Sequence, residues 1–149
     1  DECSDGDYPL IISVPNGQLL PRKLPGKTTT ARLIAIADDD ISTYADAAAY
    51  AAAQTGEGSI AANAIIPAGM FTDSGLPRPT AMINGTVLAT ACKTNALTGQ
   101  TYYWCRLATY GMEIEAVYPA KAFTTPPQAG NIISGLYWMT GSIDTPAQT

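Results

Sequence analysis

Apolar and polar residues alternate most clearly between Met112 and Tyr118, where Ile114 and Ala116 alternate with two glutamates. Side chains of a β-strand point alternately to its two faces, so this pattern predicts a strand with one buried and one wet face. Residues 86–91, 102–107 and 132–139 are rich in β-branched and aromatic residues and predict further strands. The dipeptide Asn84-Gly85 predicts a hairpin turn before the first of them. Together these segments predict an antiparallel meander.

Residues 30–54 carry an apolar period closer to that of a helix. The residues that fall on one helical stripe are Leu33, Ile34, Ala37, Ile41, Tyr44, Ala45, Ala48 and Ala52. One interpretation is a single helix from about Thr30 to Gln54. The other is a strand that breaks at Asp38-Asp39-Asp40 and leads into a helix capped by Asp40 or Ser42. In both, residues 43–54 are helical because alanine has the highest helix propensity, and Gly56 ends the helix.

The predicted fold class is therefore α+β, with one main helix packed on an antiparallel β-sheet. Residues 8–14 predict a short β-segment, and Pro15-Asn16-Gly17 predicts a turn after it. Further prolines follow, so we expect residues 1–30 to form an extended N-terminal arm. Residues 31–149 are expected to form a single globular domain.

The cysteines suggest a disulfide. A symmetric hairpin with its tip near Thr98-Gly99 would place Cys92 opposite Cys105, at a separation that a disulfide tolerates. The alternative is a reduced cytosolic protein with two buried thiols. Cys3 then remains as a free thiol, as an intermolecular partner, or as a replacement for one member of the pair. A disulfide would indicate an oxidising compartment.

The same hairpin predicts a candidate interface. Alternation places Tyr102, Trp104 and Arg106 on one face of their strand, opposite the face that carries the disulfide. These are the residue types enriched at binding hot spots. Ordinary packing against a second core is the other interpretation of the same pattern.

Composition narrows the possible functions. The chain has no histidine, which removes the commonest general base and the usual zinc ligand, so we expect neither catalysis, nor a metal, nor a cofactor. Glu113 and Glu115 share one strand face and could serve a carboxylate-dependent hydrolase, but solvent exposure explains them more simply. The three aspartates are expected to form a solvated helix cap rather than a cation site.

Charge and hydropathy bear on partners and location. The net charge is −5, which argues against nucleic acid as a partner. Charged residues make up only 14 % of the chain, which suits an exported protein. No apolar stretch approaches the roughly 18 residues that cross a bilayer, so no membrane insertion is expected.

A family resemblance adds a specific hypothesis. The stretch from Asp40 to Ile60, followed by Ile66-Pro-Ala-Gly-Met70 and Ile83-Asn-Gly-Thr86, resembles type IV pilins and pilus-associated proteins. The resemblance covers about residues 35–110 and implies a helix, a glycine-rich loop and then an antiparallel sheet. The chain departs from that family in residues 1–30, because pilins begin with a long apolar helix.

The sequence thus predicts a non-enzymatic, extracellular structural subunit or accessory protein of a pilus-like surface filament. Its partners would be further copies of itself or another protein of the cell or virion surface. The alternative is a monomeric or ring-forming binding module, such as an adhesin tip, a toxin-like binding subunit or a phage virion decoration protein.

Overall fold

The structure is a computed structural model that describes residues 9–20, 26, 29–56, 58–70, 73 and 75–144. These residues form six strands, one α-helix and three short 3₁₀ turns. The strands are β1 (Ala31–Tyr44), β2 (Ala64–Ile66), β3 (Thr80–Thr94), β4 (Thr101–Ala108), β5 (Glu113–Pro119) and β6 (Ile132–Ile143). The helix is α1 (Ala47–Ala53), and the turns are η1 (Gly17–Leu19), η2 (Ala68–Met70) and η3 (Ala120–Ala122).

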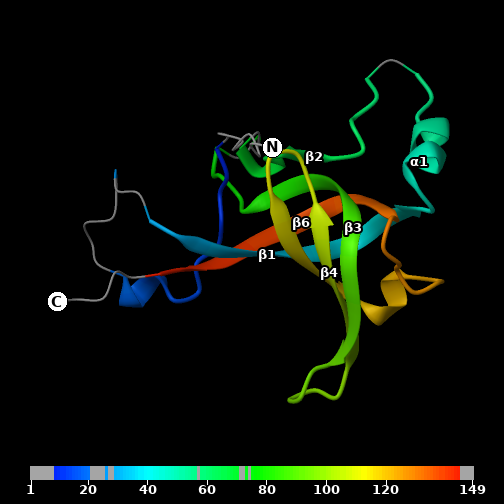
Figure 1. Cartoon of the computed structure of the whole chain (residues 1–149). Coiled ribbons are helices and arrows are strands. Elements are labelled where there is room, and N and C mark those ends of the chain that lie inside the picture. The colour runs from blue at the N-terminus through cyan, green and yellow to red at the C-terminus, as the bar shows by residue number, and fades with distance from the viewer. Residues whose placement is uncertain are drawn as a thin grey trace.

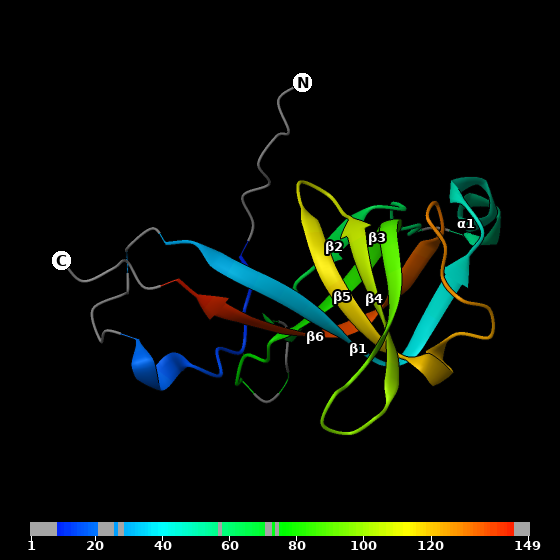
Figure 2. The same ribbon diagram turned by 60° about the horizontal axis from the view of Figure 1, so that its bottom comes forward.

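Five of the strands close into a barrel (Figures 1 and 2). The strand order is β2-β3-β4-β5-β1-β6, and β6 also pairs with β3. Closure depends on the length of β3, because its first half, from Thr80 to Thr86, pairs with β6 and its second half pairs with β4. The pair β1–β5 is parallel, and the other pairs are antiparallel. Closure leaves few strand edges unpaired, the usual solution for a small β-protein.

The expected fold class is wrong, because no main helix packs on a sheet in the described part of the chain. Residues 31–44 form β1, whose Ala35 is fully buried and whose Ile36 is exposed on the outer side. The apolar positions of this segment satisfy a period of two as well as a helical stripe. Pairing with β6 on one side and β5 on the other decides in favour of the strand.

The helix that remains is short and lies outside the barrel (Figure 1). It begins after Asp46, whose carboxylate accepts a hydrogen bond from the backbone N–H of Ala49 at 2.7 Å. The cap is therefore Asp46 rather than Asp40 or Ser42. Asp38-Asp39-Asp40, expected to form a helix cap, instead lie in β1 where its register with β6 shifts between Ala37 and Ile41.

Asn84-Gly85 is also not the predicted turn, because β3 runs through it without interruption. At Gly85 a Cβ atom would lie 2.9 Å from the Cβ of Leu107, so the glycine allows β3 and β4 to approach closely. The Asn84 side chain is buried and donates to the Tyr50 hydroxyl at 2.8 Å and to the Ala61 carbonyl at 2.9 Å. This dipeptide therefore serves packing and hydrogen bonding rather than chain reversal.

The alternation predicted for residues 112–118 is confirmed. Ile114, Ala116 and Tyr118 are buried on the inner side of β5. Inside the barrel the hydroxyls of Tyr118 and Tyr137 share a hydrogen bond of 2.7 Å. Burial, together with the neighbouring Tyr137, raises the pKa of Tyr118 well above its usual value, and burial likewise raises the pKa of Tyr137.

The described part of the N-terminal arm packs against the domain. Leu10 and Ile12 contact the core, and Ser13 forms a parallel bridge with Thr140 of β6. The Ser13 N–H donates to the Met139 carbonyl at 2.9 Å, and the Gly141 N–H donates to the Ser13 carbonyl at 3.0 Å. The predicted turn after this segment is confirmed, since the Gly17 N–H donates to the Val14 carbonyl.

Candidate functional site

The outer surface of the barrel carries the predicted interface residues. Cys105 and Leu107 of β4 are fully buried, so Tyr102, Trp104 and Arg106 point outward on the other side of the strand. Their placement on one face is confirmed, while their role in binding stays a prediction. Sequence reasoning found these three residues because alternation along a single strand is local information.

Strand pairing continues the row of Trp104 across three more strands. Trp104 lies opposite Val117 of β5, Val117 lies opposite Ile36 of β1, and Ile36 lies opposite Trp138 of β6. Both tryptophans of the chain therefore lie in one transverse apolar row. Three strand spacings of about 4.8 Å place them at most roughly 14 Å apart along this row. We call this surface, with Tyr102, Arg106, Arg32, Ile34 and Glu115, the two-tryptophan face.

A polar network holds the face in one arrangement. The indole N–H of Trp104 donates to Glu115 at 3.1 Å. The guanidinium of Arg32 donates to both oxygens of the same carboxylate, at 3.1 and 3.3 Å. The ammonium of Lys93 lies 5.2 Å from the centre of the Trp104 ring, within the range of a cation–π contact. Four neighbouring strands thus fix the orientation of one indole.

The face is hollow beside Val117 and Ile36, the two middle residues of the row. A groove of about 450 Å³ lies over β1 and β5, with Ile34, Ile36, Val117 and Pro119 among the residues that line it. A second hollow of about 320 Å³ shares Ile34 and Thr140 with the groove and continues to Pro15-Asn16 of the N-terminal segment. None of the described side chains that line the groove is charged, so this lining favours an uncharged or apolar contact.

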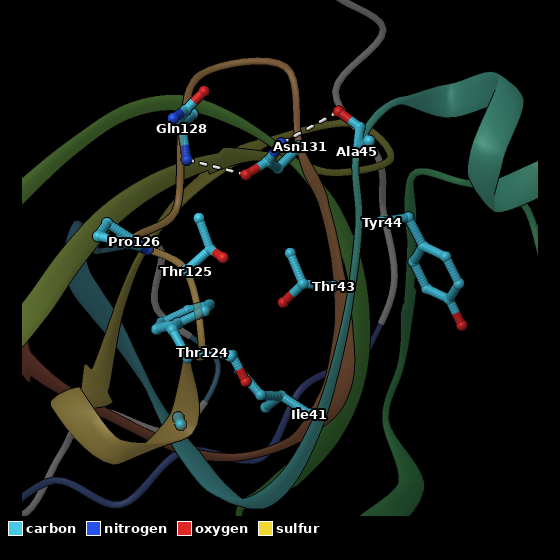
Figure 3. Close-up of a pocket in the computed structure, with 11 residues that line it drawn as sticks. Ile41, Thr43, Tyr44, Ala45, Thr124, Thr125, Pro126, Gln128 and Asn131 are labelled. Atoms are coloured by element: carbon cyan, nitrogen blue, oxygen red, sulfur yellow. Dashed lines mark hydrogen bonds between the residues drawn. The ribbon is translucent and has the colours of Figure 1, made fainter.

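A separate cavity of about 470 Å³ lies at one mouth of the barrel (Figure 3). We call it the mouth cavity. One wall is the end of β1, from Ile41 to Ala45, and the other is the loop between η3 and β6, from Ala122 to Asn131. Sequence reasoning missed it, because its walls are far apart in the chain and contain no charged residue. The run Thr124-Thr125-Pro126-Pro127 was the only local signal.

The register of the β3–β4 hairpin differs from the one predicted. Cys105 lies opposite Thr90, and Cys92 lies opposite Tyr103, so the prediction is wrong by two residues. The side-chain oxygen of Asn95 accepts hydrogen bonds from the N–H groups of Leu97 and Thr98, which centres the loop ahead of Thr98-Gly99. The bulge between Val87 and Ala89 adds a further shift along β3.

The disulfide that depended on that register is not formed in the structure. Both thiols are free: Cys92 is exposed, whereas Cys105 is buried and hydrogen-bonds the hydroxyl of Thr90 at 3.5 Å. Burial raises the pKa of the Cys105 thiol, although its hydrogen bond to Thr90 opposes this. Cys3 lies outside the described residues.

The glutamates considered for catalysis are both engaged with arginines. Glu115 is paired with Arg32, and Glu113 lies 3.4 Å from Arg106. In the described residues there is no group of three histidine, cysteine or acidic side chains that could hold a metal ion. Nor is any helix in this part of the chain long and apolar enough to cross a membrane.

Comparison with protein-family models, with curated proteins and with solved structures found no match to this chain. The two-tryptophan face and the mouth cavity are therefore the candidate functional sites of this chain.

Proposed function

We propose that this chain is a non-enzymatic subunit of an extracellular surface assembly, and that the two-tryptophan face is the contact between neighbouring subunits. The observation that carries the proposal is the row of Trp104, Val117, Ile36 and Trp138 across four strands. Trp138 is 45 % exposed and Ile36 is 41 % exposed, so both side chains still have a large area to bury. Burial of such area is the main favourable term in association.

The surroundings of the row support a protein contact. Tryptophan, tyrosine and arginine dominate the energetics of protein interfaces, and all three occur here. The row is apolar, while the pairs Arg32–Glu115 and Arg106–Glu113 lie beside it. An apolar centre with a charged rim is the usual anatomy of an interface. Because the rim charges already have partners within the chain, a neighbour can cover them without leaving an unpaired charge.

The pairing of the two glutamates with arginines also supports a non-enzymatic role. Acid–base catalysis by two carboxylates needs them to face a substrate from two sides. Glu113 and Glu115 are instead on one side of a single strand, and each is held by an arginine.

The assembly expected from the sequence is a filament. A contact between two different patches of the same chain generates an open filament unless the rotation closes a ring. The N-terminal segment offers a second patch, because its turn at Pro15-Asn16 lies at the far end of the groove system. The second candidate function is a discrete module that binds another surface protein. It is favoured by barrel closure, which leaves few edges for a neighbouring subunit to extend.

Negative-stain electron microscopy of the wild type and of a Trp104→Ala/Trp138→Ala variant tests the proposal. We expect filaments or regular oligomers in the wild type and separate particles in the variant. Tyr110→Ala is the matched control, since Tyr110 is 65 % exposed in the turn between β4 and β5 and does not line the groove. Separate particles in all three proteins would overturn the proposed assembly and favour the second candidate function, a discrete binding module.

A further inference from the structure

The mouth cavity is preformed by hydrogen bonds within the protein. The side-chain amide of Asn131 donates to the Ala45 carbonyl at 3.0 Å, and its oxygen accepts from the Gln128 N–H at 2.9 Å. The dashed lines in Figure 3 mark these two bonds across the rim. The same loop is tied to β3, because Gly130 and Asn131 exchange backbone hydrogen bonds of 2.8 Å with Val87. The opening is therefore set by the protein's own contacts, so little ordering is needed on binding.

Part of the cavity lining is apolar and packed against neighbouring side chains. Phe123 is packed edge-on against Tyr103 and Tyr118, with ring centres 5.5 and 5.1 Å apart. Ile41 and Ala122 also line the cavity. Ile41 is fixed from behind, since its methyl group lies where any Cβ at position 135 would clash. A flat apolar ligand face would find a surface of fixed shape here.

The walls carry hydroxyl and amide groups. Figure 3 shows the side chains of Thr43 and Thr125 pointing toward one another across the opening, while Tyr44 points away. Among the described residues, the hydroxyls of Thr43, Thr124 and Thr125 have no hydrogen-bond partner in the protein. A hydroxyl both donates and accepts, so these groups match ligand hydroxyls better than a ligand that only accepts.

The lining of the mouth cavity disfavours charged ligands. Among the residues that the structure describes, no lysine, arginine, aspartate or glutamate lines the cavity, so these residues offer neither an anion nor a cation a counter-charge. The volume of about 470 Å³ falls in the range of small-molecule sites, which often lie in the mouths of β-barrels.

From these observations we propose that the mouth cavity binds a small uncharged polyhydroxylated ligand, namely a neutral sugar unit. The apolar face of the sugar ring lies on Phe123 and Ile41, and its hydroxyls bond Thr43 and Thr125. This site is independent of the two-tryptophan face and of the assembly proposed for it.

The test is a titration of the full chain followed by amide NMR shifts. The probes are the methyl glycosides of glucose, galactose and mannose, and N-acetylglucosamine, compared with glucuronate and glucosamine as charged probes. At least one neutral sugar should bind saturably and shift the amides of Thr43, Thr125 and Gln128. The charged sugars should bind at least about tenfold more weakly, because the site offers no counter-charge.

Three variants locate the site. Thr43→Val and Thr125→Val keep the side-chain shape and remove one hydroxyl each, and each should weaken binding about tenfold. Thr94→Val, at an exposed threonine of β3, should bind like the wild type, with unchanged spectra elsewhere. The proposal fails if no neutral sugar binds saturably. It also fails if charged sugars bind equally well, if Thr43→Val and Thr125→Val both bind normally, or if Thr94→Val weakens binding as much as they do.

Discussion

Trp104 of β4 donates its indole N–H to Glu115 of β5 at 3.1 Å, and the same carboxylate is held from the other side by Arg32 of β1. The side chain of Glu115 is 27 % exposed, whereas that of Arg32 is 69 % exposed. The carboxylate therefore joins three strands at a partly buried position and holds the tryptophan in one orientation.

A double-mutant cycle with Trp104→Phe and Glu115→Gln should measure this coupling. We expect a coupling free energy of about 0.5–1 kcal/mol in urea unfolding, because the pair is partly screened by solvent. Glu113→Gln is the matched control, since Glu113 and Arg106 are both about half exposed or more and lie 3.4 Å apart. That control should change the free energy of unfolding by much less than Glu115→Gln. Equal effects of the two glutamine variants would show that Glu115 has no special role.

The hydroxyl pair of Tyr118 and Tyr137 makes stability depend on alkaline pH. Burial raises the pKa of both groups in the folded state, so folding favours their neutral forms. Their contribution is fully present below the unfolded pKa of about 10 and is lost as pH rises above it. We expect the absorbance of their phenolates to appear only together with loss of the near-ultraviolet circular dichroism. Ionisation of every tyrosine near pH 10 in a protein that stays folded would contradict this account.

Asn84 ties the helix region to the barrel. It is 1 % exposed, and its amide reaches Tyr50 of α1 and the carbonyl of Ala61. Asn84→Ala should cost about 2–3 kcal/mol of stability, because buried groups lose their partners. Tyr50→Phe removes the hydrogen bond from Asn84 and also the one that the Tyr50 hydroxyl donates to the Ile60 carbonyl, and it should cost about 1–2 kcal/mol. Amide hydrogen exchange should become faster in residues 47–62 of the alanine variant. Protection equal to that of the wild type would show that Asn84 does not connect the helix region to the barrel.

The free thiols differ in accessibility. In a Cys3→Ser background, Cys92 should react with Ellman's reagent in the native protein, because it is exposed. Cys105 should react only after denaturant is added, since it is fully buried. If neither thiol reacts in denaturant before reduction and both react in denaturant after it, a disulfide joins them and the observed hairpin register is incorrect.

The sequence alone predicts those features of the fold that depend on the local pattern of apolar and polar residues. Ile114, Ala116 and Tyr118 alternate along one strand, so β5 and its buried face follow from spacing alone. The same holds for the outward direction of Trp104. Barrel closure does not follow, because it depends on pairs such as Thr80 with Trp138, which lie far apart in the chain. Nor could local pattern supply Arg32 and Glu115 as partners of Trp104, since they come from β1 and β5.

Two errors have clear physical causes. Leu33, Ala37 and Ile41 fit a helical stripe, but backbone pairing with two neighbouring strands outweighs helix propensity in residues 31–44. Asn84-Gly85 has the composition of a turn, but the buried amide of Asn84 and the close approach at Gly85 explain both residues within a continuous strand. In both cases tertiary contacts override a local signal.

Sedimentation velocity over a wide range of protein concentration measures whether the two-tryptophan face joins neighbouring subunits. We expect the wild type and Tyr110→Ala to sediment faster as concentration rises, and Trp104→Ala/Trp138→Ala to stay a monomer with an unchanged fold. A wild type that remains monomeric at every concentration, or a double variant that associates as strongly as the wild type, would contradict the claim that the two-tryptophan face joins neighbouring subunits.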